Sequence, residues 1–138
     1  MKTKILILAL IYLLLLGSVF SAEKKEIANI DWRELFTEPS EIVYVIMKDG
    51  ATFPCTSKHE VMVDMSIGRL EEKLRKVKGK NYSIKEIAII IHNHRKKKSF
   101  SRSDYKQYWT LKSYGFDGRF LLYCHMTNKT YNIEDKTD

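Results

Sequence analysis

The chain has 138 residues, of which 44% are hydrophobic and 30% charged, and its formal net charge is +7. This length leaves room for a single hydrophobic core and excludes a second domain of ordinary size. The sequence contains no internal repeat and no low-complexity segment, which excludes a repeat array.

Residues 1–21 have the pattern of an export signal. Lys2 and Lys4 precede an apolar run at 5–16, and small residues follow it. Cleavage after Ser21 fits the small-residue rule best and takes the formal charge from +7 to +5, because both lysines leave with the signal. We therefore expect an exported protein, periplasmic or secreted. An uncleaved signal that anchors the chain in a membrane is the alternative, since the apolar run approaches bilayer-spanning length.

The next part of the chain predicts the first elements of an α/β domain. The amino-terminal segment 22–40 is polar and contains a short helix pattern at 31–36. An apolar strand pattern at 42–47 is followed by Asp49-Gly50, a dipeptide typical of tight turns, and then by a second strand at 51–55. These features predict a β-hairpin.

A helix is predicted at 59–78, where apolar residues recur at spacings of three and four. Gly79 is expected to end it. Later elements are a buried strand at 87–91, a helix at 102–114, strands at 120–126 and 130–133, and a polar tail at 134–138. The order predicts one α/β (α+β) domain with a mixed, curved sheet flanked by helices.

The most informative residues follow the buried strand. His92 and His94 are two positions apart, so on an extended chain they share one face while Asn93 points the other way. Two imidazoles in this arrangement can bind one metal ion. Asp104 adds a carboxylate from the next helix, which is expected to open near Ser101 with a capping spacing. Two nitrogens and one oxygen leave a coordination position for a water molecule, as catalytic zinc sites require.

This pattern resembles the JAB/MPN (JAMM) metalloproteases, and more particularly their RadC-like branch. The family motif is His-x-His, a loop, and Ser-x-x-Asp, which here reads His92-Asn93-His94 and Ser101-Arg102-Ser103-Asp104. The resemblance covers 41–133 and implies a domain of the JAB/MPN (cytidine-deaminase-like) type. It departs from the family pattern in two places: the loop is one residue shorter, and Arg95 stands where the family has a proline.

The resemblance also implies roles for the site residues. His92, His94 and Asp104 would hold one Zn²⁺, and Ser101 would steady the oxyanion. Glu41 lies at about the right separation upstream to serve as the general base, with Glu38 and Glu60 as substitutes. By this resemblance the protein would hydrolyse a peptide or isopeptide bond. The hydroxyl of Ser101 also has a purely structural alternative, which is to cap the helix.

The loop after the histidines carries four adjacent cations, Arg95, Lys96, Lys97 and Lys98. Beside a metal site they would bind substrate, attracting an acidic peptide or protein and repelling a cationic one. The alternative function uses the same charges: a nonenzymatic binding module for nucleic acid or another polyanion, on a degenerate JAB-like fold.

Two cysteines, Cys55 and Cys124, could close one disulfide in an exported protein. Neither belongs to a Cys-x-x-Cys pair, so a zinc site built from cysteines is not expected.

Overall fold

The computed structural model describes residues 27, 30–38, 40–55, 66–77 and 79–135. The elements that follow all belong to one compact unit, Trp32–Asp138. The export signal expected at 1–21 lies outside the described residues. Among the residues that are described, no helix is long and apolar enough to cross a membrane.

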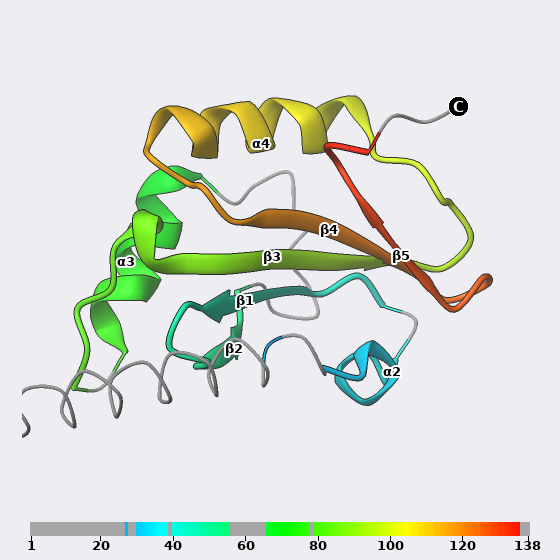
Figure 1. Cartoon of the computed structure of the whole chain (residues 1–138), viewed down its shortest axis with the longest axis horizontal. Helices are drawn as coiled ribbons and strands as arrows, with labels where there is room; N and C mark the ends of the chain where they lie inside the picture. The colour runs from blue at the N-terminus through cyan, green and yellow to red at the C-terminus, as the bar shows by residue number, and fades with distance from the viewer. Residues whose placement is uncertain (1–26, 28–29, 39, 56–65, 78, 136–138) are drawn as a thin grey trace, which may run out of the picture. The chain divides into compact units, whose positions relative to one another are not determined.

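Five strands form one mixed sheet in the order β2-β1-β3-β4-β5 (Figure 1). In chain order they are β1 (Val43–Met47), β2 (Thr52–Pro54), β3 (Ile87–His94), β4 (Arg119–Cys124) and β5 (Lys129–Asn132). β3 pairs in parallel with β4, and each other neighbouring pair is antiparallel. The mixed α/β class is therefore confirmed, whereas the JAB/MPN type stays a prediction.

The predicted hairpin is formed by β1 and β2. Gly50 has a φ of 90°, a left-handed conformation that glycine adopts without steric cost. The Asp49 side chain accepts a hydrogen bond from the Ala51 backbone N–H at 3.1 Å, which closes the turn. β1 lies between β2 and β3 and is antiparallel to both. Its first residue pairs with His92, so the residues just before β1 lie beside the carboxyl end of β3.

The described helices are α2 (Trp32–Leu35), α3 (Ile67–Lys76) and α4 (Arg102–Ser113). The start expected for the second of these, at 59, lies outside the described residues. Gly79, expected to end it, has a φ of 73° shortly after the helix. A short 3-10 helix, Ile84–Glu86, was not predicted. It begins with a capping box between Ser83 and Glu86 and leads directly into β3.

One hydrophobic core joins α3 and α4 to the same face of the sheet. Leu74 of α3 and Leu111 of α4 are fully buried in it, together with Ile90 of β3. Side chains alternate along a strand, so His92 and His94 project from this same face. On the opposite face Phe36 stacks against Tyr123 with ring centroids 5.5 Å apart. The sheet therefore presents the two histidines toward the side on which α4 packs.

The disulfide that the sequence allowed does not form. Cys55 follows β2 and Cys124 ends β4, and both are buried thiols. Two strands, β1 and β3, lie between those elements, so about three strand spacings of roughly 4.8 Å separate them. Disulfides require Cα atoms within about 7 Å, and the sheet order is therefore incompatible with this pairing.

Candidate metal centre

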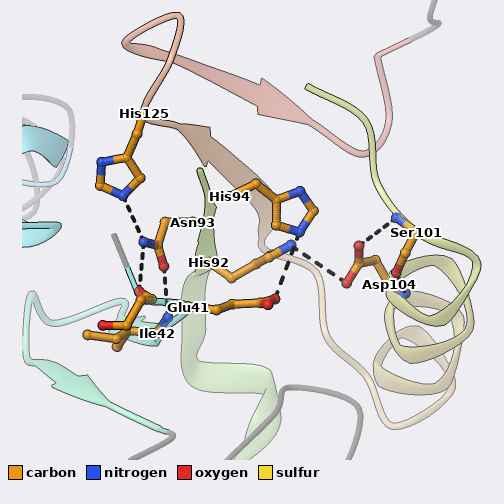
Figure 2. A network of polar contacts seen from close by, with 9 residues as sticks. Glu41, Ile42, His92, Asn93, His94, Ser101, Asp104 and His125 are labelled. Carbon is orange, nitrogen blue, oxygen red and sulfur yellow. Dashed lines mark hydrogen bonds and ion pairs between the residues drawn. The ribbon is translucent and has the colours of Figure 1, made fainter. Parts of the chain in front are cut away.

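The two histidines lie on a regular part of β3. The strand was expected to end before them, but it continues to His94, because His92, Asn93 and His94 pair with Leu122, Tyr123 and Cys124 of β4. The imidazole rings of His92 and His94 are 4.9 Å apart between centroids. Asn93 points to the opposite side, as alternation predicts (Figure 2). A paired strand therefore fixes the backbone that carries both imidazoles.

Three ring nitrogens of this pair are buried without a hydrogen-bond partner: Nδ1 and Nε2 of His92, and Nδ1 of His94. Buried polar side-chain atoms in proteins nearly always have a partner, so this exception calls for a ligand. Burial lowers the pKa of His94, and the neighbouring His92 lowers it further. A neutral imidazole keeps a lone pair for a metal ion, so the ring of His94 fits such a ligand.

Glu41, just before β1, completes the tightest group of potential ligands. Its Oε1 lies 3.8 Å from Nε2 of His94 (Figure 2). Within the described ranges, Glu41, His92 and His94 form the group whose ligand atoms all lie within 4.8 Å of one another. The Glu41 side chain is 41% exposed, so its carboxylate also reaches solvent. Of the two substitutes, Glu60 lies outside the described residues and Glu38 contributes its backbone carbonyl to a contact described below.

Asp104 comes from the first turn of α4 and faces His92. Its Oδ1 lies 3.6 Å from Nε2 of His92, and its side chain is only 7% exposed. Its Oδ2 accepts a hydrogen bond from the Ser101 N–H at 2.6 Å, while the Asp104 N–H donates to the Ser101 hydroxyl at 3.1 Å. The predicted cap is therefore present, and it engages one carboxylate oxygen while the other faces the imidazole.

Asp104 is strongly acidic. Burial alone would raise its pKa, but the imidazole of His92 and the hydrogen bonds from Ser101 outweigh burial and lower the pKa to about 2. The carboxylate is therefore ionised at neutral pH and supplies negative charge beside a buried imidazole.

Two separate pairs of potential ligand atoms have nearly the spacing of neighbouring ligands on a small cation. Two ligands at about 2.1 Å from a tetrahedral ion lie roughly 3.4 Å apart. The separations of 3.6 Å between His92 and Asp104 and 3.8 Å between His94 and Glu41 approach that value. One difference from the predicted ligand set is notable, because the tightest group contains Glu41 in place of Asp104. Both carboxylates are thus placed beside the imidazole pair.

The four cations of the loop, Arg95 to Lys98, are all exposed and lie between β3 and α4. The loop starts from a fixed point, because the Arg95 carbonyl accepts a hydrogen bond from the Met126 N–H at 3.1 Å. Phe100, further along the same loop, packs 5.9 Å from the ring of His92. The loop therefore places an apolar ring against the buried imidazole and positive charge at the surface nearby.

One polar contact near the site could not be inferred from local sequence. His125 lies just past β4, and its Nε2 is 2.8 Å from Nδ2 of Asn93. The two residues are 32 positions apart, so no short motif connects them. The parallel pairing of β3 with β4 brings them together.

Comparison with protein-family models, with curated proteins and with solved structures finds no match for this chain. The interpretation of the site therefore depends on its residues and their geometry.

Proposed function

We propose that the protein is an exported, zinc-dependent hydrolase that attacks an amide carbonyl, resembling JAMM-type peptidases and isopeptidases. The observation that supports this most strongly is the buried, unpartnered imidazole of His92 beside the carboxylate of Asp104. His94 and Glu41 lie next to this pair, so nitrogen and oxygen ligands converge on one region. That donor set suits Zn²⁺, and its two carboxylates balance a divalent charge.

The residues have distinct roles in this proposal. His92, His94 and Asp104 hold the ion, which when bound supplies the Lewis acidity that activates water at neutral pH. Glu41 is partly exposed and beside His94, so it can take a proton from the attacking water and return it to the leaving group. The Ser101 oxygen accepts from the Asp104 N–H, and its O–H would turn from the Asp104 carboxylate to donate to a developing oxyanion.

The substrate class follows from different observations than the metal site does. A zinc centre can hydrolyse esters and several kinds of amide, and a fold does not determine the substrate. The peptide or isopeptide assignment follows from the resemblance of the His-x-His and Ser-x-x-Asp pattern. The exposed charges of Arg95, Lys96, Lys97 and Lys98 favour an acidic peptide, because they lie on the loop that borders the site.

Metal content and turnover of the exported protein and two variants test the proposal. We expect about one zinc ion per wild-type chain, none in His92→Ala, and an undiminished amount in Glu41→Gln. Turnover of a peptide substrate should fall by a factor on the order of 10² to 10⁴ in Glu41→Gln, the range for loss of a general base. Glu72→Gln, on the exposed side of α3, is the matched control and should behave as wild type. Unchanged zinc in His92→Ala would refute the ligand assignment.

A second candidate function is a nonenzymatic module that binds nucleic acid or another polyanion. The exposure of all four adjacent cations, Arg95 to Lys98, favours it. In that case replacing the four with serine should weaken binding to a polyanion such as heparin and reduce its salt dependence, and chelators should have no effect. Binding that persists unchanged in high salt would count against this candidate.

A further inference from the structure

Asn93 is a fully buried polar residue on the face of β3 opposite the histidines. Its amide group contacts the segment that leads into β1, more than fifty positions earlier in the chain, and Figure 2 shows these contacts beside the metal centre. β1 starts only at Val43, which pairs with His92. The Asn93 side chain therefore continues the connection between the two strands beyond the point where their backbone ladder ends.

The two shortest of these contacts enclose Glu41. Oδ1 of Asn93 accepts a hydrogen bond from the Ile42 N–H at 2.7 Å, and its Nδ2 donates to the Ser40 carbonyl at 2.9 Å. These two groups belong to the peptide units on either side of Glu41. A longer contact of 3.4 Å reaches the Glu38 carbonyl. One side chain thus fixes both peptide planes that determine where the Glu41 side chain starts.

The Ile42 N–H fixes the orientation of the Asn93 amide, and His125 supports it. The Ile42 N–H can only donate, so the atom facing it is the Asn93 oxygen, and the amide nitrogen must face Nε2 of His125 at 2.8 Å. Nε2 then accepts, which places the ring proton of His125 on Nδ1. The His125 ring meets Phe36, at 6.4 Å, and Tyr123, at 5.1 Å, edge to face, and those two rings stack on each other. The Asn93 amide therefore bonds to a histidine ring that packs against two aromatic rings.

We infer that Asn93, supported by His125, is a positioning residue that holds the backbone of Glu41 so that its carboxylate faces the imidazole pair. The inference rests on the proposed function and extends it, because it explains how a carboxylate outside the sheet ladder keeps its place beside the metal centre. In β3, His92 and His94 then present ligands on one face, and Asn93 between them holds the backbone of the base on the other face. Partners that orient groups around a metal commonly affect its properties by this route.

The first arm of the test requires no metal. Amide hydrogen exchange is measured by NMR for Ile42 and, as a reference, for Met47, whose N–H donates to the Ala51 carbonyl within the hairpin. In Asn93→Leu the Ile42 amide should exchange faster by at least about 10-fold, the effect of losing one hydrogen bond, while Met47 keeps its protection. Ile91→Leu, on the same face of β3 and equally buried, is the matched control and should leave both amides unchanged. Asn93→Ala replaces Asn93→Leu if the latter does not fold.

The second arm measures Co²⁺ absorption spectra of wild type, Glu41→Gln, Asn93→Leu and the double variant. We expect all four to bind about one equivalent of Co²⁺, with Asn93→Leu and the double variant giving the spectrum of Glu41→Gln and not that of wild type. Such non-additivity is expected when one residue acts through the other, and a purely structural role would not produce it.

Three results would overturn the inference: an Ile42 amide that stays protected in the folded Asn93 variants, a wild-type Co²⁺ spectrum in Asn93→Leu, or loss of Co²⁺ binding in Asn93→Leu but not in Glu41→Gln. The last would mean that Asn93 supports the histidines directly. A wild-type chain that binds no Co²⁺ would contradict the proposed function, and the exchange arm alone would then decide whether Asn93 holds the Glu41 backbone.

Discussion

The buried polar side chains on the two faces of β3 differ in their hydrogen bonding. His92 and Asn93 are neighbours in sequence, and both are fully buried. The amide oxygen and nitrogen of Asn93 both have partners, on three different residues of the segment before β1 and on His125. The two ring nitrogens of His92 have none within hydrogen-bonding distance. Two adjacent and equally buried residues therefore differ in whether their polar atoms have hydrogen-bond partners.

The difference follows from the energetics of burial. A buried polar group that keeps its hydrogen bonds stabilises the fold slightly, whereas one without a partner costs roughly 1 to 3 kcal/mol. Asn93 belongs to the first kind, because its amide atoms keep their hydrogen bonds. His92 belongs to the second kind, and a bound cation would offset its cost. The predictions below test whether the two residues differ in this way.

The largest expected effect is stabilisation by zinc. At a free concentration about 1,000-fold above the dissociation constant, a ligand that binds only the folded state adds about 4 kcal/mol to the free energy of unfolding. Wild type should gain this amount, and His92→Leu should gain nothing. Thermal or urea unfolding with zinc and with chelator measures both. Equal gains in the two proteins would show that zinc binds somewhere other than at His92.

The same substitution at the two neighbouring positions should have different effects on the metal-free protein. Asn93→Leu leaves the Ile42 N–H and the Ser40 carbonyl without their partner, so we expect a loss on the order of 3 kcal/mol in unfolding free energy. His92→Leu removes two ring nitrogens that have no hydrogen-bond partner, but it also removes the imidazole that lowers the pKa of Asp104, so we expect a loss that is smaller than that of Asn93→Leu. Urea unfolding in chelator compares them, and equal losses would contradict the distinction between the faces.

The smallest expected effect separates the cap from the metal centre. Ser101→Ala removes the hydroxyl that accepts the Asp104 N–H, which should cost about 1 kcal/mol of stability while zinc content stays at the wild-type level. Asp104→Ala removes the cap partner and the carboxylate that faces His92, so it should lose similar stability and also bind zinc more weakly. If the two variants bound zinc equally well, Asp104 would have only the structural role.

Much of this arrangement could be predicted from the sequence because its signals are local. The Asp49-Gly50 turn predicted the hairpin, and the alternation of His92, Asn93 and His94 predicted which side chains share a face. The spacing of Ser101 and Asp104 predicted the cap that the structure contains. In each case the interacting groups are at most a few residues apart, so the pattern itself carries the information.

The rest depends on contacts between distant residues. The strand β3 was expected to stop before His92, but pairing with β4 extends it through both histidines. The contact of Asn93 with Ile42 spans 51 positions, and no local pattern reveals it. Whether Cys55 and Cys124 could pair was open in the sequence for the same reason, because the order of strands in the sheet decides which residues meet.

The central claim is that the imidazoles of His92 and His94 bind one divalent cation together with a carboxylate. A crystal structure of the zinc-loaded protein, with anomalous diffraction recorded on both sides of the zinc absorption edge, tests it most directly. We expect a single anomalous peak at about 2.1 Å from one nitrogen of each ring and from an oxygen of Asp104, with Glu41 close by. A peak located elsewhere, or no peak between these side chains in zinc-loaded crystals, would contradict the account.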